Sequence, residues 1–511
     1  MKTMKYFLSM AALALVGAMT VSCSSDDNIT DQPQQPETKN NVVTLTTTVG
    51  LDGGAGTTRA LTSTGVKTFA VGETMALCYF NTKGDWVKAV SNALEAGDIA
   101  DGSKSATFTF TLTNPDKTKT VDYIYPAAIV NTFGNMDEAA LFGSQDGTLN
   151  KIASTFDYSR KKAAWNGDNL PSLTLENQLA ILAVTLMNAD GSSDITSSIT
   201  GLTLSDGTKT YNVSRSAAAG PIYVAIFPTA DATITVTATD GTKNYTKTLT
   251  SKTYAKGNGY PVSWKMAEII SLSGRYASDD ELVIADGCIL TGYGFNYSCK
   301  VSIADGATVT LRDVENKGDI AGCPGIKCLG DATIILEGNN TVTGGDQYAG
   351  IYVPGDKTLT IRGTGTLNVT GGSSAAGIGG NATGDANCGS IVISGGTVTA
   401  TGGFGGAGIG LGANGEGCKA ITISGGTVTA KGFDQAPGIG GAAGYYDSIT
   451  ITGDVTKVTA TRGSGAQYSI GIEDVDSWDY CGPITIGGTV YFDEGNFTND
   501  DLKTSQFVYQ P

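Results

Sequence analysis

Between residues 42 and 266, apolar and polar side chains alternate in short runs. The run 106–113 places Phe108, Phe110 and Leu112 on one face and threonines on the other, as in a half-buried antiparallel strand. Similar runs occupy 42–50, 233–239 and 260–264, and the turn sequence Asp-Gly-Thr-Lys follows at 206–209 and 240–243. The pattern predicts two β-sandwich domains, 42–171 and 172–268, with a boundary near Pro171.

From residue 269 onward the pattern becomes a repeat. The dipeptide Gly-Ile recurs at intervals of 25, 27, 31, 30 and 33 residues. Its positions are Gly325-Ile326, Gly350-Ile351, Gly377-Ile378, Gly408-Ile409, Gly438-Ile439 and Gly471-Ile472. Short strands rich in Ile, Val and Thr lie between them, joined by glycine pairs. This spacing predicts a right-handed parallel β-helix over 269–511, with three short strands per coil and inward Ile and Val side chains stacked in columns.

One stretch of the repeat, residues 408–417, also contains the G-x-G-x-x-G spacing of dinucleotide-binding turns, at Gly410, Gly412 and Gly415. That motif holds a phosphate only where an amphipathic helix follows it. Here a short strand and another Gly-Gly turn follow, so these glycines are interpreted as corners of the solenoid.

The first 22 residues have the layout of a secretory signal peptide. Lys2 and Lys5 precede an apolar stretch, Phe7 to Met19, that is too short to span a bilayer. Cys23 follows small residues and precedes a Ser-Asp-Asp run. This arrangement resembles a bacterial lipobox, which implies lipidation of Cys23 and display on the outer face of the outer membrane; the alternative is an ordinary signal peptide with an incidental cysteine. Residues 23–41 are expected to form a flexible tether.

Composition narrows the chemistry available to the chain. Its 511 residues carry a formal net charge of -16, which disfavours nucleic acid as a partner. The absence of histidine removes Ser-His-Asp and Cys-His catalysis and every metal site that needs imidazole. Only carboxylate chemistry remains for an enzyme, and no tight group of acids outside 473–480 shares one strand column. We therefore expect no catalytic residues.

The chain has nine cysteines, and three of them share a place in the repeat. Cys388, Cys418 and Cys481 each stand three residues before the first Ile of a strand pair, with Tyr446 at the matching place in the intervening coil. A Cys388–Cys418 bridge is sterically possible, and buried free thiols are the commoner outcome. Cys323 and Cys328 flank a Pro-Gly turn and could pair.

Candidate ligand-binding residues lie between each glycine corner and the next Gly-Ile. They combine aromatic rings with amides and a carboxylate, which suits carbohydrate, because sugar C–H faces pack on rings while hydroxyls bond polar groups. These residues are Gln347, Tyr348, Phe404, Phe433, Asp434, Gln435, Gln467 and Tyr468, together with Trp478 and Tyr480 further along. The alternative is that corner loops of a solenoid simply tolerate such residues.

An acidic cluster occupies 473–480. Glu473, Asp474, Asp476 and Asp479 surround Trp478 and Tyr480, and several close carboxylates could bind Ca²⁺. The alternative is a solvated acidic loop. No other cofactor is expected.

Three segments resemble the fimbrillin family, the two-domain β-sandwich pilins of type V pili. They are residues 57–80, 176–186 and 254–264. The resemblance implies that an arginine-specific protease cuts after Arg59, releasing 23–59 with its first strand, so that a neighbouring pilin donates a strand into the groove. The alternative is that Arg59 is an ordinary loop residue. The 269–511 region also loosely resembles β-helix modules of bacterial surface carbohydrate-binding proteins.

Together these features favour a non-catalytic, lipid-anchored adhesin. A sandwich fused directly to a large solenoid cannot easily swing out a donor strand, so we expect a pilus tip subunit that accepts a strand and presents the β-helix to a glycan or protein ligand. The alternatives are a free-standing carbohydrate-binding lipoprotein and a polysaccharide-degrading β-helix enzyme with paired carboxylates.

Overall fold

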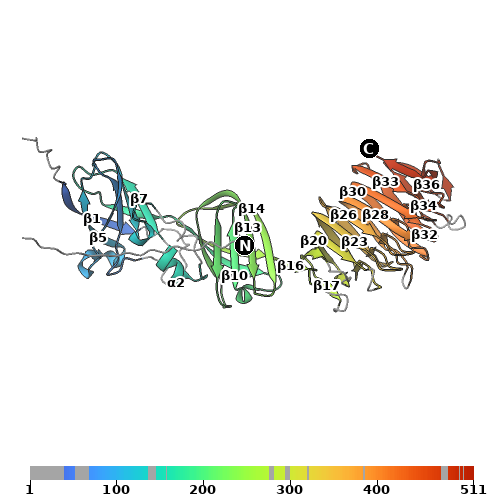
Figure 1. Cartoon of the computed structure of the whole chain (residues 1–511), viewed down its shortest axis with the longest axis horizontal. Helices are drawn as coiled ribbons and strands as arrows, with labels where there is room; N and C mark the ends of the chain where they lie inside the picture. Colours follow the sequence, from blue (N-terminus) through green and yellow to red (C-terminus); the bar gives the residue numbers. More distant parts are fainter. Residues whose placement is uncertain are drawn as a thin grey trace, which may run out of the picture.

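The computed structural model describes residues 40–51, 68–135, 145–156, 158–274, 281–293, 300–318, 322–383, 386–473, 481–493, 495–498 and 500–511. Figure 1 shows three bodies in a row, which follow the sequence from blue through green to red. Almost all of the regular structure is strand, so the predicted all-β fold is confirmed. Among the described residues, no helix has both the length and the apolar character that a membrane crossing requires.

The first body is a β-sandwich formed by one eight-stranded sheet in the order β3-β2-β6-β7-β8-β1-β5-β4; its two halves join where β8 pairs with both β7 and β1, and they share one core. Its strands are β1 (Val42–Leu51), β2 (Ala76–Phe80), β3 (Trp86–Val90), β4 (Ile99–Ala100), β5 (Ser105–Thr113), β6 (Val121–Tyr125), β7 (Ser159–Ala163) and β8 (Leu173–Asn177). Alternate residues of β5 and β6 meet in one core with Phe69, whose ring centroid lies 5.3 Å from that of Phe108 and 5.0 Å from that of Tyr125. The alternation read from 106–113 therefore describes a real buried face.

Short helical turns connect these strands. They are η1 (Ala96–Asp98), η2 (Asp101–Ser103), η3 (Ala127–Ile129), α2 (Leu149–Lys151) and the π-helix η4 (Ile152–Phe156), with η5 (Thr196–Ser198) in the second body. Ile152 and Phe156 of this helical stretch pack with Ile124 from the first body and with Ile181 and Ala225 from the second. The two sandwiches consequently share a small core of their own.

The second body packs a three-stranded sheet, β12-β9-β15, against a larger antiparallel one. Its strands are β9 (Ala180–Met187), β10 (Gly201–Ser205), β11 (Thr210–Ser214), β12 (Ile222–Ile226), β13 (Thr229–Thr239), β14 (Asn244–Tyr254) and β15 (Gly259–Lys265). The two Asp-Gly-Thr-Lys turns join β10 to β11 and β13 to β14, as expected. Pro261 is tolerated in β15 because this strand pairs on one side only, with β9.

The boundary predicted near Pro171 is wrong. β8 lies after Pro171, yet it pairs with β7 and β1 of the first body. Conversely, Gln145 lies before Pro171 and joins the second body. Its backbone pairs with Val213, and its buried side-chain amide bonds both the N–H and the C=O of Ala225, at 2.8 and 2.9 Å. The chain therefore crosses between the sandwiches three times, which no composition shift marks.

The predicted boundary at residue 269 also falls inside a strand. β16 (Ala267–Ser271) pairs antiparallel with β14 of the second body and parallel with β18 (Ile289–Tyr293), a strand of the third body. The second sandwich and the β-helix therefore share one continuous hydrogen-bonded sheet, which runs from β10 to β38.

The third body is a parallel β-helix. One side is a column of short strands: β17 (Leu282–Ile284), β19 (Val301–Ile303), β21 (Ile326–Cys328), β24 (Ile351–Tyr352), β27 (Ile378–Gly379), β29 (Ile409–Gly410), β31 (Ile439–Gly441) and β34 (Ile470–Ile472). The other sides comprise, besides β18, β20 (Ala307–Lys317), β22 (Ala332–Glu337), β23 (Asn339–Thr343), β25 (Thr358–Gly363), β26 (Thr366–Thr370), β28 (Ser390–Phe404), β30 (Gly417–Phe433), β32 (Tyr445–Ile451), β33 (Lys457–Thr461) and β35 (Ile484–Ile486). Each coil thus contributes three short strand segments, as predicted.

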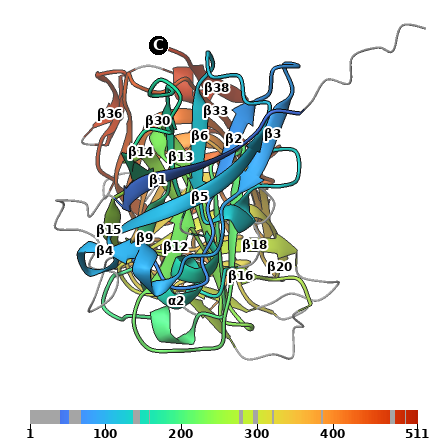
Figure 2. The ribbon, with the colours of Figure 1, turned by 90° about the vertical axis from the view of Figure 1, so that its left-hand side faces the viewer.

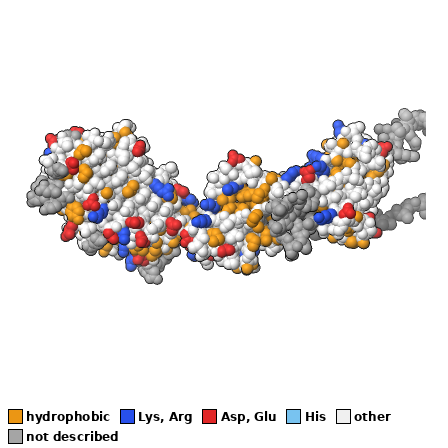
Figure 3. Space-filling model, turned by 180° about the vertical axis from the view of Figure 1, so that it is seen from behind, with side chains coloured by type: hydrophobic (Ala, Val, Ile, Leu, Met, Phe, Trp, Pro, Cys, Tyr) orange, Lys and Arg blue, Asp and Glu red, His pale blue; other side chains and the backbone are white. Residues whose placement is uncertain are grey.

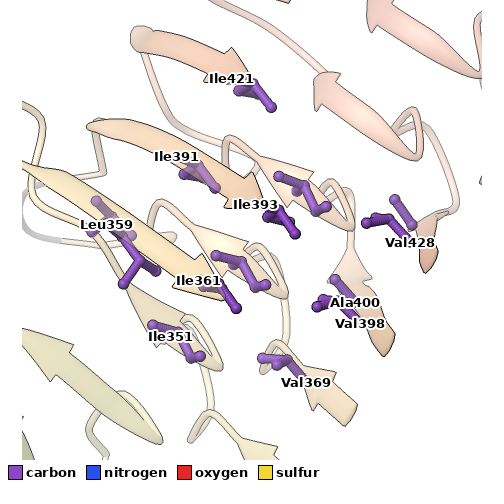
Figure 4. Close-up of a cluster of buried hydrophobic side chains, with 14 of the residues drawn as sticks. Ile351, Leu359, Ile361, Val369, Ile391, Ile393, Val398, Ala400, Ile421 and Val428 are labelled. Atoms are coloured by element: carbon purple, nitrogen blue, oxygen red, sulfur yellow. The ribbon is translucent and has the colours of Figure 1, made fainter. Parts of the chain in front are cut away.

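Inward side chains stack in columns from coil to coil. Figure 4 shows Leu359, Ile391 and Ile421 in one such column, and each pairs in register with the next. All three are fully buried. Because parallel coils lie about 4.8 Å apart, an aliphatic chain of each coil packs on its neighbour and the core extends without interruption.

The register corrects one repeat position. Ile439 pairs with Ile470, and Gly440 pairs with Gly471. The last repeat point is therefore Ser469-Ile470 rather than the predicted Gly471-Ile472. The dipeptide rule failed there because Ser469, also fully buried, replaces the glycine.

The glycines of 408–417 are corners, as interpreted. Gly410 has φ +133°, and a Cβ at this position would lie 2.1 Å from the carbonyl oxygen of Gly440 in the next coil. A side chain at Gly410 is excluded both by this backbone conformation and by the neighbouring coil.

Residues 484–511 close the far end of the β-helix. β36 (Thr489–Asp493) and β37 (Asn496–Phe497) fold back on β35, and β38 (Gln506–Tyr509) pairs antiparallel with β33. Between them η7 (Asp501–Lys503) buries Leu502 completely. This cap covers sheet edges that would otherwise be open to strand addition.

Candidate functional site

The first strand lies between two others that it holds together. Over nine residue pairs β1 runs antiparallel to β5, and its last three residues pair in parallel with β8. Figure 2 looks onto β1 and β5, which lie side by side across the front of the molecule. Every second residue of β1 faces the core: Val43, Leu45, Thr47, Val49 and Leu51.

Burial deepens along this strand. Val43 and Leu45 are half-buried, whereas Thr47, Val49 and Leu51 are buried. The Thr47 hydroxyl donates a hydrogen bond of 2.8 Å to the carbonyl of Pro171, next to β8. Without β1, the facing edges of β5 and β8 and the apolar sites for Val49 and Leu51 would be uncovered. Arg59 and Cys23 lie outside the described residues.

The end of the second sandwich is fixed differently. β15 pairs with β9 over seven residue pairs, and Trp264 is 7% exposed in the core of this body. β16 follows one residue later and pairs on both sides. Detaching β15 would therefore also disturb the strand that joins the sandwich to the β-helix.

At one corner of the β-helix two predicted aromatic residues lie side by side. Phe404 and Phe433 are register partners on adjacent coils, 58% and 54% exposed, with ring centroids 6.4 Å apart. They form the only exposed aromatic pair among the ring contacts described for the β-helix. Gln435 is exposed beside them, and Asp434 is half-buried with φ +55°.

The same corner of the preceding coils carries other residues, and we call these equivalent positions the corner series. Ser373 lies one coil before Phe404, and Asp346 lies two coils before it. The glycines that precede them stack closely, because a Cβ at Gly372 would lie 1.8 Å from the carbonyl oxygen of Gly345, and a Cβ at Gly403 would lie 1.8 Å from that of Gly372. Gln347 is exposed with φ +67°, and Tyr348 is half-buried. The structure therefore brings these predicted residues onto one edge of the β-helix.

Two predicted ligand-binding residues, Gln467 and Tyr468, lie in the coil after Phe433 and do not add a second exposed ring to this edge. Tyr468 is 6% exposed, and its ring stacks on Phe497 of the C-terminal cap with a centroid distance of 5.0 Å. Its ring therefore packs against the cap and is not part of an exposed ligand-binding surface. Gln467 is exposed, and its backbone carbonyl accepts a hydrogen bond of 2.6 Å from Arg462.

The carboxylate of Glu473 is already hydrogen-bonded within the protein. Its two carboxylate oxygens accept the backbone N–H groups of Gln467 and Tyr468, at 2.5 and 2.9 Å. Burial raises the pKa of this carboxyl, and the two amides oppose that shift. Asp474, Asp476, Asp479, Trp478 and Tyr480 lie outside the described residues, and within the described part of the chain no three His, Cys, Asp or Glu residues form a group that could hold a metal.

Other carboxylates of the β-helix also bond the backbone of the next coil. Asp286 accepts from the N–H of Thr308 at 2.7 Å, Asp305 from that of Asp331 at 2.9 Å, and Asp331 from that of Thr358 at 2.8 Å. This arrangement uses acids to hold successive corners together.

The cysteine column exists as predicted. Cys388 pairs with Cys418, Cys418 pairs with Tyr446, and all of them are buried. Cys388, Cys418, Cys481, Cys323 and Cys328 all carry thiols that form no disulfide in the described part of the chain. Burial raises the pKa of Cys418 well above its ordinary value, so this thiol stays protonated and packs as a small apolar group.

A buried ion pair of the first body, Arg160 with Asp122, was not predicted from the sequence. Arg160 donates from Nε to both oxygens of Asp122 at 2.9 Å, and Asp122 is fully buried. The sequence feature that could have predicted this ion pair is an aspartate inside the apolar strand 121–125, because a buried carboxylate requires a partner.

Comparisons with known proteins found one family model and several solved structures that are similar to parts of the chain. Residues 391–413 and 421–445 match the model of a family described as beta helix repeat. No curated protein matches the chain. Solved structures similar to part of it include a fimbrial assembly protein from Parabacteroides distasonis ATCC 8503, at 13% identity and a TM-score of 0.24, covering 44% of this chain and 91% of that one. A candidate cell adhesion protein from Bacteroides fragilis NCTC 9343 has 10% identity and a TM-score of 0.25, covering 42% and 88% of the two chains. Another, from Bacteroides eggerthii DSM 20697, has 12% identity and a TM-score of 0.21, covering 43% and 85%.

Proposed function

We propose that this protein is a non-catalytic surface adhesin at the tip of a pilus. Its first sandwich accepts a strand from a neighbouring pilin in place of β1, and its β-helix forms the adhesive head. The observation that carries the proposal is the contrast between the two ends of the sandwich pair. β1 is the first strand of the described residues and pairs with β5 and β8, whereas β15 leads directly into a strand bonded on both sides.

Replacement of β1 is physically reasonable. Cleavage after Arg59 would separate residues 23–59 from the rest of the chain and leave β1 held by non-covalent contacts alone. An incoming strand would satisfy the same backbone groups of β5 and β8 and refill the same apolar sites. The donor should carry apolar residues where β1 has Val43, Leu45, Val49 and Leu51, with a small polar residue at the place of Thr47.

Donation by this chain is disfavoured for the complementary reason. β16 would have to leave both β14 and β18, and the last strand, β38, is paired with β33 in the cap. A subunit that accepts a strand and cannot give one terminates a fibre.

The exposed Phe404 and Phe433 pair is the proposed ligand face of the head. Paired rings on a rigid edge, with Gln435 and Gln347 in the same corner series, suit the C–H faces and hydroxyls of a glycan. In this proposal lipidation at Cys23 holds the chain at the outer membrane before processing.

The assembly step is tested by cleaving the purified protein with an arginine-specific protease and mixing it with stalk pilin from the same cell. We expect one-to-one complexes that do not grow. An Arg59→Ala variant is the control and should remain unassociated. Growth of this protein into chains by itself, or complexes that form equally well with Arg59→Ala, would contradict the proposal.

The ligand face is tested on a glycan array with the full chain. Phe404→Ala with Phe433→Ala should abolish binding while leaving the melting temperature nearly unchanged, since both rings are more than half exposed. Tyr445→Ala, which removes another exposed ring of the β-helix, is the matched control. Equal loss in both variants would remove the face from the proposal.

Lipidation is tested by metabolic labelling with a palmitate analogue. The label should mark the protein and disappear in Cys23→Ala. Labelling that persists in this variant would contradict anchoring through Cys23.

A further inference from the structure

The first sandwich contains a cavity of about 560 Å³ on the outer face of the β3-β2-β6-β7 half of its sheet. Its lining includes Phe80, Trp86, Ile124, Asn135, Arg160 and Lys162. Strand register brings them together, because Phe80 pairs with Trp86 and Ile124 pairs with Arg160. This volume lies within the range of roughly 300–1,000 Å³ that small-molecule sites occupy.

The aromatic wall of the cavity is held in place by the protein. The Phe80 and Trp86 ring centroids lie 4.8 Å apart, with a 59° angle between the ring planes. Trp86 donates from Nε1 to the carbonyl of Gly134 at 3.1 Å. Gly134 has φ +76°, and a Cβ there would lie 2.7 Å from that nitrogen, so the loop can close over Trp86 only because this residue is glycine.

Hydrogen-bond donors dominate the opposite side. Asp122 fixes the Arg160 guanidinium through Nε and Nη2 and raises its pKa, while the Arg160 side chain remains 34% exposed. Within the described part of the chain, Nη1 of Arg160 donates no hydrogen bond and Lys162 has no ion-pair partner. Asp122 is fully buried beneath Arg160, and no carboxylate is among the described residues that line the cavity.

Figure 3 shows acidic and basic side chains scattered over the face seen from behind, with most of it uncharged. The chain as a whole carries a charge of -16. Asp122 neutralises Arg160, so among the described residues at this cavity Lys162 leaves one positive charge in excess beside the aromatic wall, opposite in sign to the chain as a whole. Such a site attracts an anion that also has an apolar face.

We propose that this cavity binds an acidic saccharide unit, a sugar that carries a carboxylate. The ring C–H face packs on Phe80 and Trp86, and the carboxylate accepts hydrogen bonds from Arg160 and Lys162. The side-chain amide of Asn135 and the hydroxyl of Thr120, which also lines the cavity, meet the ring hydroxyls. This site is separate from the Phe404 and Phe433 corner and does not depend on strand exchange.

Titration calorimetry of the full chain with glucuronic acid and N-acetylneuraminic acid tests this proposal. Glucose, glucose 6-sulfate and a capped dipeptide with a free carboxylate are the comparison ligands. At least one of the two acidic sugars should bind about tenfold more tightly than each comparison ligand, and its affinity should fall as salt rises. Arg160 is not a useful variant, because its removal would leave Asp122 buried and unpaired.

Lys162→Glu should weaken binding of the acidic sugar by about tenfold or more, because the change turns an attraction into a repulsion. Lys161→Gln is the matched control, since it removes a lysine from the next position of β7, on the other face of the sheet and paired with Glu176. Its affinity should match that of the unchanged protein.

Four outcomes would overturn the proposal. They are no binding of either acidic sugar at millimolar concentration, equal binding of glucose, equal binding of the dipeptide, or unchanged affinity in Lys162→Glu when circular dichroism shows that variant to be folded. Preference for glucose 6-sulfate would overturn the assignment to a carboxylate.

Discussion

The first sandwich and the β-helix achieve stable cores by opposite routes. In the sandwich, strands distant in sequence meet, and large aromatic side chains such as Phe108, Phe110 and Tyr123 fill one closed core. In the β-helix, each coil repeats the last, and small aliphatic side chains stack in columns with glycine at the corners. We therefore expect the first sandwich to accept replacement of a whole strand, and the β-helix to tolerate little change at its corners.

The largest effect should come from a corner of the β-helix. Gly410→Val forces a side chain onto a backbone with φ +133° and against the Gly440 carbonyl, so we expect a loss of about 4 kcal/mol or more in unfolding free energy. Gly453→Val is the control, because its Cβ would meet nothing within 4 Å. Chemical denaturation measures both, and equal losses would contradict the close-packed corner.

Core truncations should act region by region. Phe110→Ala should cost about 3–5 kcal/mol in the first sandwich and Ile421→Ala about 2–5 kcal/mol in the β-helix. Because the two residues belong to separate cores, each change should lower one calorimetric transition and leave the other in place. A single transition that shifts equally in both variants would show that the regions unfold together.

The strand that joins the second sandwich to the β-helix provides a smaller test. Ile269→Pro removes a backbone N–H donor from β16 and leaves the carbonyl that accepted from it unpaired. We expect a loss of about 1–3 kcal/mol in unfolding free energy. Hydrogen exchange should accelerate at β14 and β18 together. Ile269→Ala keeps the backbone donor and should leave exchange at these strands slow, so acceleration in both variants would assign the effect to the side chain.

The smallest effects distinguish the regions by pH. In the second sandwich, hydrogen bonds led by the Lys243 N–H lower the pKa of Asp240 from 3.8 to about 2. Its stabilisation is therefore complete above pH 3.8 and is lost as pH falls toward 2. In the β-helix, burial raises the pKa of Glu473 above 4.5, so its ionised form opposes folding and stability increases as pH falls toward 4.5.

Two substitutions isolate these contributions. Asp240→Asn should reduce the loss of stability below pH 3.8, and Glu473→Gln should reduce the decline in stability just above pH 4.5. Thermal melts across pH measure both effects. Over each titration we expect the unfolding free energy to change by about 1 kcal/mol or less, as for exposed or half-buried polar contacts. Parallel curves for the unchanged and substituted proteins would contradict the stated pKa directions.

The sequence predicted the features of the first sandwich and of the β-helix that depend on local periodicity, and it missed those that depend on contacts between distant segments. Alternation identified β1 and β5, and the Gly-Ile spacing identified the coils, because both depend on local periodicity. The register at Ile470 was missed because Ser469 replaced the expected glycine, and β16 was missed because its pairing joins segments that no local pattern connects.

The candidate site follows the same division. Phe404 and Phe433 were predicted as corner residues and lie side by side, because their place in the repeat fixed their register. Tyr468 was grouped with them, yet the C-terminal cap covers its ring, and that contact arises from a fold-back outside the repeat. The cavity with Trp86 and Arg160 depends on three strand pairings, none of which is visible from spacing alone.

We propose above that this chain accepts a strand in place of β1 and does not donate one. The most direct measurement is native mass spectrometry of the chain after cleavage at Arg59 and removal of the released segment, alone and with a synthetic peptide of residues 42–51. We expect a monomer that binds one peptide, and a peptide with Val49→Asp and Leu51→Asp should not bind. Self-assembly into ladders of this protein alone, or indifference to the peptide, would contradict it.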